Sequence, residues 1–173
     1  AAAALAGGML LLGSACGKKE VTLLVAAPMS GEQAQAGRDI LDAVRFAAEE
    51  WNLKGGVLGK QVVVESADDK GDPEVAAKIA AEWNGKADAV IGHYNSSCTL
   101  AAMEVYYKDR TLMVTPSSTN PEITERGYPL VFRVCGRDDQ QGKSAAVYVA
   151  GHFPGAKVAV LHDNSTYGKE LAN

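Results

Sequence analysis

Two short polar segments carry side chains suited to binding a small charged molecule. The segment His93-Tyr-Asn-Ser-Ser97 stands where a strand is expected to lead into a helix, and the segment Thr115-Pro-Ser-Ser-Thr119 follows the next strand. The first turn of a helix presents free backbone N–H groups and a positive dipole, which favour a carboxylate. Hydroxyls and carbonyls suit the three donors of an ammonium group. Taken singly, however, each segment is also explained by local structure, with Ser96 and Ser97 as helix N-caps and the second segment as a turn.

Signals for other chemistry are weak. Asp68-Asp69 with Asp72 has no calcium-loop spacing, and Asp72 is expected to cap a helix instead. The histidines, His93, His152 and His162, fall on different elements, so no zinc site is indicated. No nucleophile elbow of the Gly-x-Ser-x-Gly type occurs in the sequence. We therefore expect a binding protein rather than an enzyme, with no cofactor and no metal.

The elements that must position the polar segments follow a strand–helix alternation from Val21 onward, which is typical of βαβ units and a parallel sheet. The expected strands are Val21–Ala27, Gln61–Ser66, Ala87–Gly92, Thr111–Thr115, Leu130–Val134 and Lys157–His162. The expected helices are Arg38–Asn52, Asp72–Asn84, one capped by Ser96 and Ser97, Asp139–Phe153, and one that starts near Tyr167.

Ligands of open α/β sheets bind outside the carboxyl ends of the strands. That rule selects five loops, at residues 28–37, 67–72, 93–97, 116–120 and 163–167. Their side chains are mostly hydroxyls, amides and aromatic rings, as in a site that hydrogen-bonds a small polar ligand.

Length and composition exclude several classes of protein. The chain has 173 residues, of which 47% are hydrophobic and 22% charged, so it can bury a core and disorder is not expected. Its formal net charge of −4, without a basic cluster, argues against a nucleic-acid partner.

The N-terminus reads as an export signal. Residues 1–15 form an apolar stretch that ends in small residues, and it is shorter than the ~20 residues that a membrane-spanning helix needs. Gly13-Ser-Ala-Cys16 resembles a lipobox, which predicts lipidation of Cys16 in a linker over residues 16–20. Ordinary cleavage after Ala15 is the alternative. Cys98 and Cys135 are either a disulfide pair or small buried apolar residues.

Several short motifs, in order along nearly all of the chain after residue 20, resemble the leucine/isoleucine/valine-binding proteins that deliver amino acids to bacterial ABC transporters. They are Pro28-Met-Ser-Gly31, Asp68-Asp69 with Asp72-Pro73, Val90-Ile-Gly-His93 with Ser96-Ser97, Thr115-Pro116 with Thr119 and Pro121-Glu122, Arg126-Gly-Tyr128, Arg133, Asp139 with Gln141-Gly142, and His162-Asp163 with Tyr167-Gly168.

The resemblance implies an α/β protein with a type I periplasmic-binding-protein fold, in which two lobes with parallel doubly wound sheets close on a ligand. Family members are about twice this length. Residues 21–136 would form lobe one, and residues 137–173 would form only the opening of lobe two. Delivery would be to a permease in the inner membrane, from the periplasm or the outer face of the cytoplasmic membrane. The membrane would be touched only through a lipid on Cys16.

The resemblance also implies roles for individual residues. Ser96 would hold the α-carboxylate of the ligand. The Ser117 carbonyl and the Thr119 side chain would take the α-ammonium, while Tyr94 and Tyr167 would line the pocket for the ligand's side chain. These assignments agree with the chemistry that the two polar segments suggest by themselves.

Departures from the family pattern leave the ligand open. An aromatic residue that contacts the ligand in relatives is Ala36 here, so a strict preference for leucine, isoleucine or valine is in doubt. The positions of a disulfide found in some relatives hold Gly71 and Asn95. The function expected is capture of a branched-chain or related small amino acid for import. The alternative is the extracytoplasmic ligand-sensing domain of a receptor, which uses the same fold.

Overall fold

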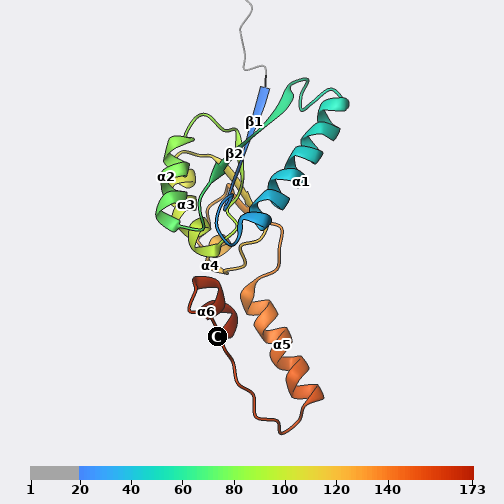
Figure 1. Cartoon of the computed structure of the whole chain (residues 1–173), viewed down its shortest axis with the longest axis vertical. Coiled ribbons are helices and arrows are strands. Elements are labelled where there is room, and N and C mark those ends of the chain that lie inside the picture. The colour runs from blue at the N-terminus through green and yellow to red at the C-terminus, as the bar shows by residue number, and fades with distance from the viewer. Residues whose placement is uncertain (1–19) are drawn as a thin grey trace, which may run out of the picture.

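A five-stranded parallel sheet organises the first part of the chain. The computed structural model describes residues 20–173, so the expected signal peptide and Cys16 lie outside the described residues. The strand order is β2-β1-β3-β4-β5, and every neighbouring pair is parallel. Helices α2 and α3 lie on one side of this sheet and α1 on the other (Figure 1). The expected parallel, doubly wound α/β arrangement is confirmed.

The element bounds lie close to those expected from the sequence. The strands are β1 (Glu20–Ala27), β2 (Gln61–Asp68), β3 (Ala89–Gly92), β4 (Leu112–Thr115) and β5 (Val131–Arg133). The helices are α1 (Ala34–Leu53), α2 (Pro73–Glu82), α3 (Ser96–Lys108), α4 (Glu122–Glu125), α5 (Asp138–His152) and α6 (Thr166–Ala172).

The core lies between the sheet and the α2–α3 side. Leu24 of β1, Val90 of β3 and Met113 of β4 are fully buried, as expected of parallel strands covered on both faces. Met103 of α3 is also fully buried and belongs to the same apolar cluster. Near the end of α1, Trp51 is 56% exposed, and the helix contacts the sheet there through Asn52, which exchanges two hydrogen bonds with the backbone of Val62 in β2.

The order of strands reverses beside β1, because β2 pairs with one edge of β1 and β3 with the other. The loops that leave β1 and β3 therefore diverge to opposite faces of the sheet, which opens a crevice between them. Gly92, the last residue of β3, allows the close approach of these two strands. A Cβ at this position would lie 2.2 Å from the carbonyl oxygen of Ala26.

Asp72 starts α2 as the sequence predicts. Its side chain accepts hydrogen bonds from the backbone N–H groups of Glu74 and Val75, and Pro73 occupies the first helical position. The cap satisfies two of the orphan donors at this helix end.

The chain after β5 leaves the sheet. Helix α5 and the segment that follows it extend below the strands in Figure 1, and α6 returns to lie near the carboxyl ends of the strands. The strand expected over Lys157–His162 is wrong: the segment has no regular structure, and Val158, Val160 and Leu161 are 63%, 64% and 94% exposed. A strand needs a neighbouring backbone for its hydrogen bonds, and within residues 20–173 no strand lies beside this segment.

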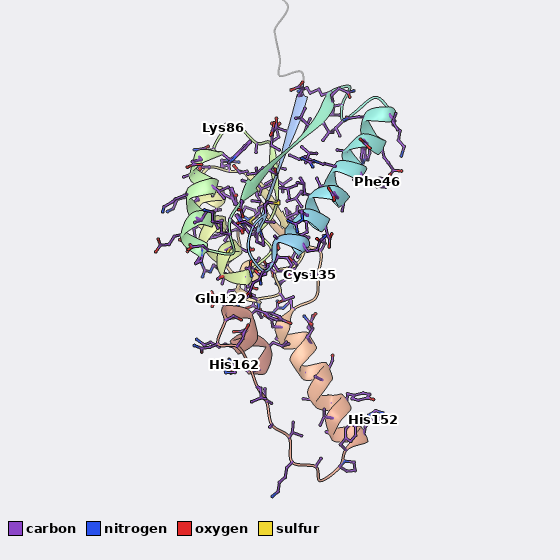
Figure 2. All side chains as sticks on the ribbon, viewed as in Figure 1. Phe46, Lys86, Glu122, Cys135, His152 and His162 are labelled. Atoms are coloured by element: carbon purple, nitrogen blue, oxygen red, sulfur yellow. The ribbon has the colours of Figure 1, made fainter. Side chains whose placement is uncertain are left out.

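Ion pairs mark the passage from the sheet into α5. Arg137 forms salt bridges with Glu125 of α4 and Asp139 of α5, and these two hydrogen-bonded carboxylates raise the pKa of its guanidinium. Figure 2 shows Cys135 on this passage. Cys98 and Cys135 are both free, so they do not pair. Cys98 is a buried apolar residue of α3, and burial, followed by the charge of Asp69, raises the pKa of its thiol to about 12.

No helix within residues 20–173 combines the length and the apolar character needed to cross a bilayer.

We predict that Asp72→Ala lowers the free energy of unfolding by about 1 kcal/mol, because two backbone donors at the start of α2 lose their acceptor. Denaturant unfolding of the variant measures the change. Asp42→Ala, which removes an exposed aspartate of α1, is the control. Equal stability of the two variants would contradict the capping role.

Candidate functional site

A cavity of about 420 Å³ lies where the loops that follow β1, β3 and β4 meet the start of α6. Helices α3 and α6 are in direct contact beside it. The residues that line the cavity are Gln33, Tyr94, Asn95, Ser96, Ser97, Ser117, Thr119, Asp163, Ser165, Thr166 and Tyr167. Four of the five loops selected from the sequence therefore contribute to one site, and only the loop at residues 67–72 does not line it.

The five predicted site residues, Tyr94, Ser96, Ser117, Thr119 and Tyr167, all line this cavity. They come from three separate loops that the fold brings together. Their roles toward a ligand stay a prediction. The other lining residues were not predicted to bind the ligand, although all of them fall within the loops selected from the sequence, with Gln33 in the loop at residues 28–37.

The N-terminus of α3 reaches the cavity, but not with the cap that the sequence predicts. Asn95 is the N-cap, and the helix begins at Ser96 itself. The expectation that Ser96 and Ser97 are N-caps is therefore wrong, because both residues already have helical conformation. The first hydrogen bond of the helix runs from the Thr99 N–H to the Asn95 carbonyl, so the preceding N–H groups have no acceptor within the helix. Ser96, with 3% of its surface exposed, adds its hydroxyl to this group of donors.

The loop after β4 is tied to the loop after β3. The hydroxyl of Ser117 donates to the Tyr94 carbonyl over 3.0 Å, and Ser118 Oγ lies 3.0 Å from the same oxygen. Thr119 Oγ1 is buried and has no hydrogen-bond partner among the described residues. The Thr119 carbonyl accepts from the N–H of Asp138, which joins this loop to the start of α5.

A buried polar network supports the site from behind. His93, at the end of β3, is fully buried, and its Nδ1 lies 2.7 Å from Oδ2 of the equally buried Asp69. Its Nε2 lies 3.3 Å from the hydroxyl of Tyr106 on α3. With the Nδ1 proton directed at Asp69, Nε2 accepts from that hydroxyl. Burial, followed by the charge of Asp69, raises the pKa of Tyr106, so the phenol stays a donor.

The backbone carbonyl of His93 is a second point of attachment. It accepts from Thr115 Oγ1 at 2.8 Å and lies 3.3 Å from Thr99 Oγ1 and 3.0 Å from Ser118 Oγ. The sequence placed Asp69 and His93 at the ends of two strands, which was the available signal for this pair, and the structure places β1 between these strands. It did not show the convergence of hydroxyls on one carbonyl. His152 and His162 lie apart from this network, on the portion of the chain below the sheet (Figure 2).

Asp68 joins the loop after β1 to the end of β2. It accepts from Ser30 Oγ at 2.6 Å and from the backbone N–H of Met29 at 2.8 Å. Partial burial acts to raise the pKa of this carboxyl, but the hydrogen bonds from Ser30, Met29 and Lys70 outweigh it and the pKa is lowered. Asp68 is therefore ionised at neutral pH and belongs to the scaffold of the site.

The α6 side of the cavity carries a negative charge. Asp163 Oδ1 accepts from the N–H and the hydroxyl of Ser165, and these bonds lower the pKa of its carboxyl. Ser165 in turn caps α6 by accepting from the Gly168 N–H. Among the described residues that line the cavity, none is a lysine or an arginine.

Comparison with known proteins identifies the family. A family model described as periplasmic binding protein matches residues 20–173. The chain belongs to this family. An amino acid binding protein of Pseudomonas aeruginosa is 42% identical over 156 residues, and the Leu/Ile/Val-binding protein homolog 1 of Brucella abortus is 40% identical over 158 residues. The alignments cover 89% of this chain and 42% of each relative.

Solved structures of periplasmic binding proteins share the fold. The branched-chain amino acid transporter substrate binding protein LivJ from Streptococcus pneumoniae, in complex with isoleucine, has a TM-score of 0.82 and 30% identity. The structural alignment covers 89% of this chain and 45% of the LivJ chain. The leucine binding protein LivK from Thermotoga maritima has a TM-score of 0.79 and 33% identity, with 87% of this chain and 43% of that chain covered. The expected resemblance and the type I periplasmic-binding-protein fold are confirmed.

We predict that Asp69→Ala lowers the free energy of unfolding by about 1–3 kcal/mol, because the buried Nδ1–H of His93 loses its acceptor. Denaturant unfolding, with Asp42→Ala as the exposed control, measures the effect. A loss no larger than that of the control would show that the network does not hold the strand ends together.

Proposed function

We propose that this chain is the ligand-binding part of an exported solute-binding protein of an ABC importer. It captures a branched-chain or related small amino acid by closure of two lobes and delivers it to a permease in the inner membrane. Binding is the whole function, and the ligand leaves chemically unchanged. The protein works in the periplasm or at the outer face of the cytoplasmic membrane, where a lipid on Cys16 would tether it.

One observation carries the proposal: residues that carry donors for a carboxylate and residues that carry acceptors for an ammonium group line the same cavity. The unpaired N–H groups of α3 and the hydroxyl of Ser96 suit an α-carboxylate, and the helix dipole adds to their attraction for it. The Ser117 carbonyl and the Thr119 hydroxyl suit an α-ammonium. Tyr94 and Tyr167 line the remainder, where the side chain of the ligand would lie.

The family relationship supports an amino acid as the ligand. One relative is named a Leu/Ile/Val-binding protein homolog, and the LivJ structure contains isoleucine. We assign residues 21–136 to lobe one and residues 137–173 to the opening of lobe two. In this arrangement the loops after β1, β3 and β4 form one wall of the site, and the loop before α6 begins the opposite wall.

Isothermal titration calorimetry on the intact gene product that carries this chain tests the proposal. The ligands are leucine, isoleucine, valine and a set of polar amino acids and amides. We expect saturable 1:1 binding of at least one amino acid, since the cavity offers groups for both charges of a zwitterion. If none of these ligands produces heat beyond dilution, the proposed function is wrong.

Thr119→Ala should weaken binding by about 1–3 kcal/mol, because the ligand's ammonium loses a hydrogen-bond acceptor in a buried site. The same titration measures the loss. Ser144→Ala removes an exposed hydroxyl of α5, outside the cavity, that bonds only within its own helix, and is the control. An affinity that Thr119→Ala leaves unchanged would refute the role given to this residue.

A further inference from the structure

The wall that remains around the ligand's side chain is built from polar and aromatic residues. When the residues assigned to the charged head group are set aside, the cavity is lined by Gln33, Tyr94, Asn95, Ser97, Asp163, Ser165, Thr166 and Tyr167. None of these described residues is aliphatic, and all carry an amide, hydroxyl or carboxylate. A pocket for leucine or valine buries methyl groups against apolar atoms, and here the tyrosine rings are the main apolar surface.

Two amides form the part of this wall that joins the loops after β1 and β3. Asn95 Nδ2 donates to Gln33 Oε1 over 2.9 Å. Gln33 and Asn95 are the N-caps of α1 and α3, yet neither side chain bonds its own helix. The pair lies beside Gly71, where a Cβ would be 3.4 Å from Asn95 Oδ1. The positions that are bridged by a disulfide in some relatives are thus adjacent here, while the side chain of Asn95 hydrogen-bonds Gln33, in the loop after β1.

Gln33 of this pair retains an unused hydrogen-bond donor. Within residues 20–173, Gln33 Nε2 has no acceptor. Asn95 Oδ1 also lacks a donor, but it is buried and lies toward Gly71, which does not line the cavity, so it is not offered to a ligand. The oxygen of a carboxamide or a hydroxyl can accept from Gln33 Nε2. An aliphatic side chain cannot, and it removes this nitrogen from water without replacing the hydrogen bond.

Charge in the cavity disfavours acidic side chains. Asp163 is ionised, and no cation lines the cavity among the described residues, so an acidic side chain would meet repulsion. A basic side chain could pair only with Asp163 among the described lining residues. Oδ1 of Asp163 is engaged by the amide and hydroxyl of Ser165 at the start of α6, which leaves one carboxylate oxygen for such a pair.

We infer that the cavity selects an amino acid with an uncharged polar side chain, of the carboxamide or hydroxyl class, over the aliphatic amino acids. Gln33 is the specificity-determining residue, because its free Nε2 donates to the oxygen of that side chain. The inference rests on the proposed function and narrows it. The head group of the ligand binds as described above, and Gln33, which Asn95 holds by a hydrogen bond, contacts the ligand's side chain.

Competition titrations on the intact gene product test the preference. Glutamine, asparagine, serine and threonine are compared with leucine, isoleucine and valine, and with lysine and glutamate. We expect one of the first four to bind at least about tenfold more tightly than any aliphatic amino acid. Tighter binding of an aliphatic, basic or acidic amino acid would overturn the inference and leave the proposed function standing. Absence of binding by every amino acid would overturn both.

The variant Gln33→Leu tests the residue. It should weaken binding of the preferred polar ligand at least about fivefold, because a donor is replaced by an apolar surface. The difference between the affinities for that ligand and for leucine should therefore become smaller. Gln35→Leu makes the same replacement one half-turn along α1, outside the cavity, and should change neither affinity. Thermal unfolding verifies that both variants fold. An unchanged ratio of polar to aliphatic affinity in Gln33→Leu would contradict the inference.

Discussion

The backbone of His93 is held from several directions, and the site depends on that restraint. The imidazole is fixed by Asp69 from the end of β2 and by Tyr106 from α3, while the carbonyl accepts the hydroxyl of Thr115 from the end of β4. The restrained residue comes immediately before the segment that lines the cavity. Buried polar groups must be hydrogen-bonded, so each of these side chains is held in one geometry by the others.

That restraint explains why flexible loops can present a defined set of donors and acceptors. Ser117 and Ser118 bond to the Tyr94 carbonyl, so the loops after β3 and β4 are tied to each other. Asp68 ties the loop after β1 to the end of β2 in the same way. The loops that line the cavity are thus held in part by residues that do not line it, such as Ser118 and Asp68, as preorganised binding requires.

The order of strands places the site, and much of this was predictable. Alternating apolar runs and amphipathic stretches indicated a parallel sheet, and the rule that ligands bind at carboxyl ends selected five loops, four of which line the cavity. Asp72 was identified as a cap because Asp-Pro-Glu is a local signal. The strand predicted over Lys157–His162 is absent from the structure, because strand formation depends on a partner strand that a local pattern does not reveal.

The sequence by itself determined the fold class, the loops that form the site and the residue types available for binding, because these follow from local periodicity and from the chemistry of side chains. Only the tertiary structure decided that Asn95 rather than Ser96 caps α3, that Gln33 meets Asn95, and that Asp69, His93 and Tyr106 form one buried chain of hydrogen bonds. These contacts join residues 62, 24 and 13 positions apart. Such pairings are set by the packing of strands and helices, which no short segment of sequence encodes.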